Sequence, residues 1–181
     1  MRRLSGLLVG AVGGAIFVLV NAQSPLAGPV VGVLRVLACV AAASVLAMWF
    51  KAAREERRNP GTPEGRTMVN RGYVLVVVAE VILLFGGLQV LRALDQPAEM
   101  NVGWVALVVG VHFIALAPAW KTWSIAVPGT VLAMLGVAGI LMVLAGSPAW
   151  VPFVSGVLSG VALLTLTVTY GWRTLSELTH R

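Results

Sequence analysis

Charge is scarce in this chain. Only 11% of its residues are Asp, Glu, Lys or Arg, whereas 59% are hydrophobic and the mean hydropathy is +0.92. A soluble globular domain averages about 25% charged and about 45–50% apolar residues. The composition therefore excludes an ordinary soluble domain. It predicts an all-α polytopic membrane protein, because a helix satisfies its own backbone hydrogen bonds in lipid.

Cysteine and the common catalytic motifs are also missing. The single cysteine, Cys39, allows no intramolecular disulfide and no cysteine-based zinc or iron–sulfur site. No lysine lies in the middle of an apolar segment, which excludes a retinal Schiff base, and the chain contains no P-loop, GxSxG, HExxH or CxxC sequence. We therefore expect no cofactor and no metal, predict no catalytic residue, and regard an enzyme as the less favoured class.

Six apolar segments match the length of a bilayer-spanning helix, which is about 20 residues. They are residues 4–22, 29–50, 73–94, 102–119, 124–145 and 150–170. What remains is too short for a separate soluble domain. The chain is thus predicted to be a single integral membrane domain, residues 1–181, in contact with the lipid bilayer.

The first segment has two interpretations. Its basic start and the small residues at its end, Val20-Asn21-Ala22, are typical of a signal peptide. Its apolar run, however, exceeds the usual signal-peptide core of about 7–15 residues. Residues 1–22 are therefore expected to be retained as the first span, with cleavage as the alternative.

Small residues recur at spacings that place them on one helix face. Glycines separated by four residues let another backbone approach closely in a membrane. The residues that carry this pattern are Gly6, Gly10 and Gly14 in the first segment and Gly156 and Gly160 in the sixth. They predict a compact bundle, or a homo-oligomer or larger membrane complex, in preference to a wide pore.

The positive charges are distributed unevenly between the two sides of the predicted membrane. With the N-terminus inside, the inner segments hold Arg2, Arg3, Lys51, Arg54, Arg57, Arg58, Arg66, Arg71, Lys121, Arg173 and Arg181, and the outer segments hold Arg92 alone. The positive-inside rule therefore predicts that both termini are inside. The expected location is the inner membrane of a bacterial cell, and the excess of arginine over lysine is compatible with a GC-rich genome.

Residues 51–72 form the only long polar segment, predicted to be a basic cytoplasmic loop. Such a loop orients the neighbouring spans, and it could also contact an anionic lipid or another protein. The net charge of +6 arises from loops of this kind, so nucleic-acid binding is not expected.

Two ionisable residues lie deep within apolar segments, Glu80 in the third and His112 in the fourth. A charge at such a depth is costly and marks a functional site by default. At ~1.5 Å per residue, Glu80 lies ~21 Å and His112 ~15 Å from the same outer edge. Antiparallel neighbours could bring the two side chains together, directly or through one water. We predict a proton-titratable pair, and the alternative is a structural hydrogen bond between helices.

A second set of polar residues lies nearer the outer edge. Arg35, Gln89 and Arg92 fall at similar depths in the second and third segments. They could form a cluster that receives an anion, or each could anchor its helix at the interface by extending towards the headgroups.

Three functions remain compatible with these features. The first is the movement or sensing of a small solute or proton through Glu80 and His112. The second is a non-enzymatic accessory or scaffold subunit of a membrane complex, which uses the small-residue faces and the basic loop. The third is an intramembrane enzyme that modifies lipid. A water-lined cavity that reaches Glu80 would favour transport, and a dry core with an exposed glycine face would favour a scaffold.

Overall fold

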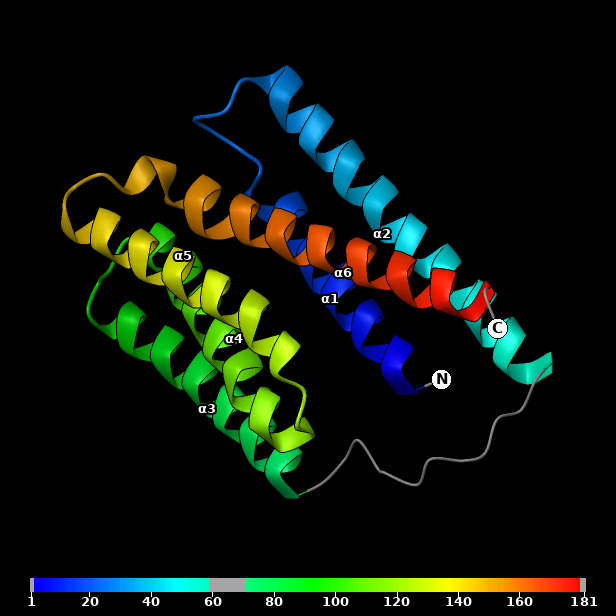
Figure 1. Cartoon of the computed structure of the whole chain (residues 1–181). Coiled ribbons are helices and arrows are strands. Elements are labelled where there is room, and N and C mark those ends of the chain that lie inside the picture. The colour runs from blue at the N-terminus through cyan, green and yellow to red at the C-terminus, as the bar shows by residue number, and fades with distance from the viewer. Residues whose placement is uncertain (1, 59–70, 180–181) are drawn as a thin grey trace.

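The computed structural model describes residues 2–58 and 71–179, and six α-helices account for most of them (Figure 1). The helices are α1 (Arg2–Asn21), α2 (Gly28–Arg58), α3 (Arg71–Ala93), α4 (Ala98–Trp120), α5 (Ala126–Leu144) and α6 (Leu158–Thr179). Short 3₁₀ turns lead into α5 and α6, and a π-helical segment, η3 (Pro152–Val157), directly precedes α6. The all-α prediction is therefore confirmed.

Five of these apolar helical segments are long enough to cross a membrane. They are Gly28–Arg54, Arg71–Ala93, Ala98–Trp120, Trp123–Leu144 and Pro148–Arg173, and the remaining apolar segment, Gly6–Asn21, is shorter. Length and composition thus support a helical multi-pass membrane protein. The sixth crossing and the inside location of both termini stay predictions.

Three of the connections end their preceding helix in the same way. Asp95, Lys121 and Gly146 each adopt a positive φ, of 48°, 54° and 77°. After each helix, two backbone N–H groups then turn back to bond the last free carbonyls, as Gln96 does to Leu91 at 3.0 Å. This is the Schellman arrangement, which satisfies carbonyls that would otherwise face a membrane unpaired.

Helix α2 is longer than its apolar segment. The predicted loop, residues 51–72, is helical over Lys51–Arg58, and α3 already begins at Arg71. The remainder of that loop, residues 59–70, lies outside the described residues. Charged residues with good helix propensity continue α2 past the apolar run, because a helix needs no apolar face once it leaves the lipid.

Helix α4 begins four residues before its predicted span. It starts at Ala98, after Pro97 in the N-cap position with φ −60°. The fixed φ of proline suits a helix start, and the carboxylate of Glu99 in the first turn complements the helix dipole. The span predicted from hydropathy began only at residue 102 because it left out these polar residues.

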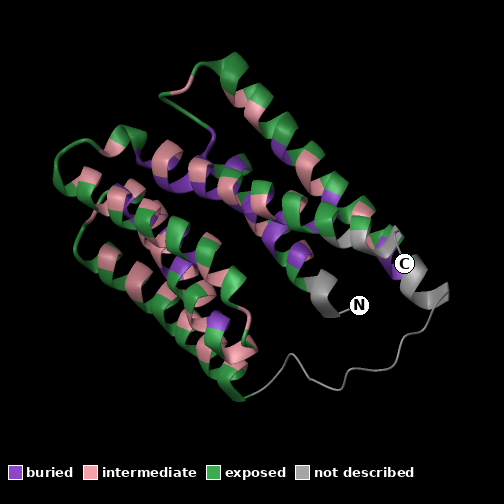
Figure 2. Ribbon diagram, in the orientation of Figure 1, coloured by how far each residue is buried: buried purple, intermediate pink, exposed green. Residues whose placement is uncertain are grey.

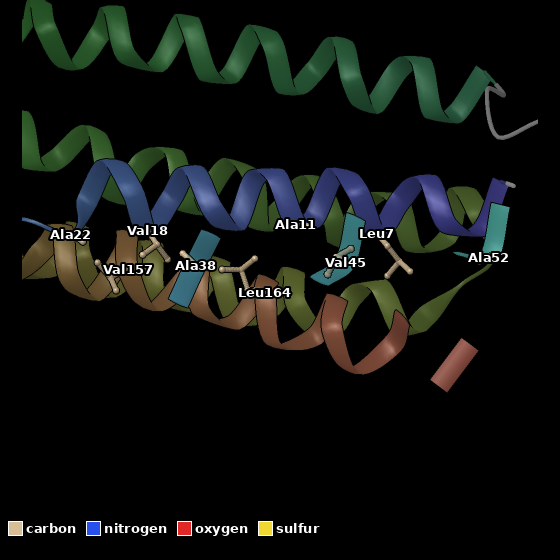
Figure 3. Close-up of a cluster of buried hydrophobic side chains, with 9 residues drawn as sticks. All are labelled: Leu7, Ala11, Val18, Ala22, Ala38, Val45, Ala52, Val157 and Leu164. Atoms are coloured by element: carbon tan, nitrogen blue, oxygen red, sulfur yellow. The ribbon is translucent and has the colours of Figure 1, made fainter. Parts of the chain in front are cut away.

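The helices form two groups that share one contact region. Helices α1, α2 and α6 pack together around a cluster of small and aliphatic side chains (Figure 3). Helices α3, α4 and α5 pack together beside them (Figure 1). Segment η3 contacts α1, α4 and α5, and so it joins the two groups.

Glycine faces allow the closest helix crossings. On α1, a Cβ at Gly14 would lie 2.9 Å from the carbonyl oxygen of Gly160 on α6. Gly10 and Gly156 also lie against side chains of the facing helix, whereas Gly6 faces open space. The same arrangement recurs between α4 and α5, where a Cβ at Gly129 would lie 2.8 Å from the carbonyl oxygen of Gly110. Backbones in contact gain van der Waals attraction and lose little side-chain entropy.

Helix α3 is different from the other five. None of its 23 residues, all of which the structure describes, is buried. Figure 2 accordingly shows α3 without the buried colour that marks α1 and η3. Of the helices in the described ranges, only α4 packs extensively against it. Its position on the bundle therefore rests on contacts along a single seam.

Two adjacent glycines on α1 test the close crossing with α6. Gly14→Ala should destabilise the protein by about 1–3 kcal/mol through overpacking, which exceeds the gain of up to about 1 kcal/mol in helix propensity. Gly13→Ala, whose Cβ would meet nothing within 4 Å, should be neutral or slightly stabilising. Thermal unfolding of the purified protein in detergent measures both, and equal effects of the two substitutions would contradict the crossing.

Candidate functional site

Glu80 and His112 face each other across the seam between α3 and α4. Glu80 lies thirteen residues before Ala93, or ~20 Å from that end of α3, and His112 lies fourteen residues after Ala98, or ~21 Å along α4. The offset of ~6 Å expected from the sequence disappears because α4 begins four residues earlier than predicted. The two side chains are therefore at the same depth, and a direct contact needs no bridging water.

The contact itself is short. Nδ1 of His112 lies 3.0 Å from Oε2 of Glu80, and the predicted pairing of these side chains is confirmed. Nδ1 of His112 is fully buried. Its orientation does not allow a hydrogen bond to any described residue, Glu80 included. We therefore describe the contact as a close electrostatic approach, in which a small rotation of the ring or the carboxylate would complete a hydrogen bond.

The pair lies at the margin of the bundle. The side chain of His112 is 13% exposed and that of Glu80 is 20% exposed. Each is mostly covered by the other helix but retains an opening to the outside. The pair is not enclosed by several helices, because α4 is the one extensive neighbour of α3 among the described helices.

The glycine face of α4 determines the direction of His112. Gly110 and Gly103 press that face against α5. His112 follows Gly110 by two residues, which is about 200° around the helix, and so it points to the opposite side, towards α3. The ring of Phe113 meets the imidazole edge-on, with centroids 5.7 Å apart. Close packing on one face of α4 thus presents the imidazole on the other.

Trp104 forms a second polar contact in the seam. Its indole ring packs over Gly87 of α3, and its Nε1 donates a hydrogen bond of 3.0 Å to the carbonyl oxygen of Leu83. A tryptophan near a helix end is expected to serve as an interfacial anchor, so its role between helices was not predicted. The available signal was Gly87, whose missing side chain leaves space for a neighbour.

A third contact lies at the opposite end of the seam from Trp104. The rings of Tyr73 on α3 and Trp120 on α4 stack, with centroids 5.8 Å apart and planes 15° apart. An aromatic stack, the carboxylate–imidazole approach and an indole hydrogen bond thus follow one another along the face of α3. Such contacts are directional, and they hold a helix whose apolar side chains are not buried.

The predicted outer residues separate into two places. The guanidinium of Arg35 donates a hydrogen bond of 2.9 Å to the carbonyl oxygen of Ala22, at the end of α1. Gln89 and Arg92 instead line a surface hollow where α3 turns into α4. Arg35 is not among the residues that line this hollow. The structure therefore brings Gln89 and Arg92 together but leaves Arg35 with the connection from α1 to α2.

A buried serine repeats the arrangement seen at Trp104. Ser155, in η3, is fully buried and donates a hydrogen bond of 2.7 Å to the carbonyl oxygen of Leu135 on α5. A Cβ at Gly139 would collide with this hydroxyl. Ser155 therefore fastens η3 to α5. One turn later, Ser159 is also fully buried, and its hydroxyl has no hydrogen-bond partner among the described residues.

The chemistry available at the seam is that of one acid and one base. Within residues 2–58 and 71–179, no three His, Cys, Asp or Glu side chains gather as a metal site would require. The carboxylate and the imidazole can exchange a proton, and each can stabilise the charge of the other. Comparison of the chain with protein-family models, with curated proteins and with solved structures found no match.

Two adjacent glycines on α3 test the seam. Gly87→Ala would place a methyl group where the indole of Trp104 lies, whereas a Cβ at Gly86 would meet nothing within 4 Å. We expect Gly87→Ala to lower the free energy of unfolding by about 1–3 kcal/mol, through overpacking and strain on one hydrogen bond. Gly86→Ala should leave it unchanged or slightly higher. Equal unfolding free energies for the two variants in bicelles would show that Trp104 is not seated on Gly87.

Proposed function

We propose that this membrane protein senses or moves protons through Glu80 and His112. The observation that supports the proposal is the 3.0 Å approach of a carboxylate and an imidazole at matching depth in two apolar helices. Ionisable residues within membrane segments commonly form proton relays and pair with one another. Glutamate and histidine are both side chains that bind and release protons in proteins.

The charge of the pair depends on how many protons it holds. With one proton shared between them, the two side chains are either both neutral or oppositely charged, and the net charge is zero. A second proton leaves the imidazolium without an anionic partner, and loss of the only proton leaves the carboxylate without a cationic one. Either change leaves one charge of the pair without its partner, so the electrostatic attraction between α3 and α4 at this contact is lost.

Helix α3 is the element that responds to such a change. It buries no side chain, and α4 is its one extensive neighbour among the described helices. Regions with few buried contacts open at a low free-energy cost. A change in the protonation of Glu80 or His112 would therefore alter the seating of α3 on α4, with less effect on the glycine-packed remainder.

Sensing receives more support than conduction. Neither Glu80 nor His112 belongs to the hollow at the turn between α3 and α4, and close glycine crossings fill the space between α4 and α5. A helix seated through a titratable contact converts proton binding directly into a structural change. Conduction would in addition require a path for water from the pair to each surface.

The exposed side of α3 favours a second candidate, an accessory or scaffold subunit. Leu75, Ile82 and Phe85 are each more than 60% exposed. A partner helix could pack against this side in place of lipid, and the pair would then influence assembly. The two candidates predict different outcomes in the following experiment.

Reconstituted protein and two matched variants test the proposed role. We expect that a pH jump that imposes an inward proton gradient on proteoliposomes changes amide hydrogen exchange in α3. The substitution Glu80→Gln should abolish that change. Proton flux, measured at the same time with an enclosed pH-sensitive dye, would add conduction to sensing. Glu99→Gln, the same substitution in the first turn of α4, is the control and should behave as wild type.

Two results would reject the proton role. One is exchange in α3 that is insensitive to pH in the wild-type protein. The other is an equal pH response in wild type and in Glu80→Gln. Recovery of a stoichiometric partner in mild detergent, combined with either result, would support the scaffold candidate.

A further inference from the structure

A hollow lies at the turn between α3 and α4, at one end of this hairpin. Figure 1 shows that this turn is at the opposite end of α3 from its start at Arg71. The hollow has a volume of about 570 Å³, within the range of about 300–1,000 Å³ that is usual for small-molecule sites. Its lining residues include Phe85, Leu88, Gln89, Arg92, Asp95 and Asn101. Neither Glu80 nor His112 lines it, so ligand binding there is independent of the proposed proton role.

The lining changes from apolar to polar along the helix axis. Phe85 and Leu88 occupy the end that lies deeper along α3, and Arg92 lies seven residues after Phe85, or ~10 Å closer to the turn. The side chain of Phe85 is 67% exposed. A hollow with this gradient, at the end of a membrane-length helix, suits an amphipathic ligand whose polar part lies at the interface.

The polar end carries one charge of each sign. Arg92 belongs to the last turn of α3, and Asp95 occupies the left-handed position that ends the helix. No described residue forms a hydrogen bond or an ion pair with the guanidinium of Arg92 or the carboxylate of Asp95. The backbone N–H of Asp95 bonds the carbonyl oxygen of Arg92 at 3.1 Å, which fixes the two residues relative to each other.

We propose that this hollow binds one phospholipid of the surrounding bilayer whose headgroup carries a phosphate and a primary ammonium, as in phosphatidylethanolamine. Arg92 binds the phosphate, since a guanidinium matches phosphate geometry and donates several hydrogen bonds. Asp95 accepts hydrogen bonds from the ammonium, and the amides of Gln89 and Asn101 complete the polar lining. The acyl chains lie towards Phe85 and Leu88.

The charges discriminate between headgroups. A phosphoglycerol headgroup offers Asp95 no cation, so an anionic lipid leaves the carboxylate beside a second negative charge. A choline headgroup is cationic but has no N–H to donate to the carboxylate. The ethanolamine headgroup alone among these three satisfies both Arg92 and Asp95.

Lipid titration of the purified full chain tests the proposal. Native mass spectrometry in detergent would compare phosphatidylethanolamine, phosphatidylcholine and phosphatidylglycerol with identical acyl chains, and inorganic phosphate would be the competitor. Wild type should bind one phosphatidylethanolamine most tightly, with no displacement by phosphate. Arg92→Gln should weaken that binding roughly tenfold.

Two further variants separate recognition from folding. Asp95→Asn keeps the shape of the side chain and tolerates the left-handed backbone, and it should abolish the preference for phosphatidylethanolamine over phosphatidylglycerol. Arg173→Gln changes an exposed arginine of α6 and should bind lipid as wild type does. Unchanged binding in Arg92→Gln, equal affinity of wild type for phosphatidylglycerol, or displacement by free phosphate would each overturn the proposal.

Discussion

One carboxylate–imidazole approach of 3.0 Å lies between an indole hydrogen bond and an aromatic stack in the seam that holds α3 on α4. No side chain of helix α3 is fully buried, so apolar packing contributes less to its position than it does for α1, α2 and α6. Polar contacts between membrane helices contribute about 0.6 kcal/mol on average and less than about 2 kcal/mol at most. A helix held by a few such contacts keeps a defined position. Its packing is nevertheless weak enough for the binding of one proton to change it.

The rest of the fold makes this seam possible by packing backbone against backbone. Trp104 packs on Gly87 and donates a hydrogen bond to the carbonyl four residues before that glycine. Ser155 packs on Gly139 and likewise donates to the carbonyl four residues before it. A side chain on a helix leans towards the N-terminus and covers the preceding turn. A glycine therefore exposes the carbonyl one turn earlier, which becomes an acceptor for a neighbouring helix. Small residues in this chain thus provide polar contacts as well as close approach.

The sequence predicted the helical class and the partners in the seam, but not how they are surrounded. Apolar length and a predicted depth difference of only ~6 Å were sufficient to pair Glu80 with His112, because both quantities follow from counting residues along helices. Three features depend on contacts between helices that counting does not reveal. Trp104 turns inward because Gly87 of another helix leaves space, Arg35 finds a carbonyl at the end of α1, and α3 lies at the margin. The proton role itself and the sidedness of the chain stay predictions.

A proton shared by the imidazole and the carboxylate can be detected by measuring how the ring of His112 responds to pH. Strongly interacting groups lose their protons in steps that belong to the pair. In lipid bilayers, the pH dependence of the ring ¹⁵N signals of His112 should change when Glu80 is replaced by Gln. Identical titration curves in the two proteins would contradict the account, because the two side chains would then not share a proton.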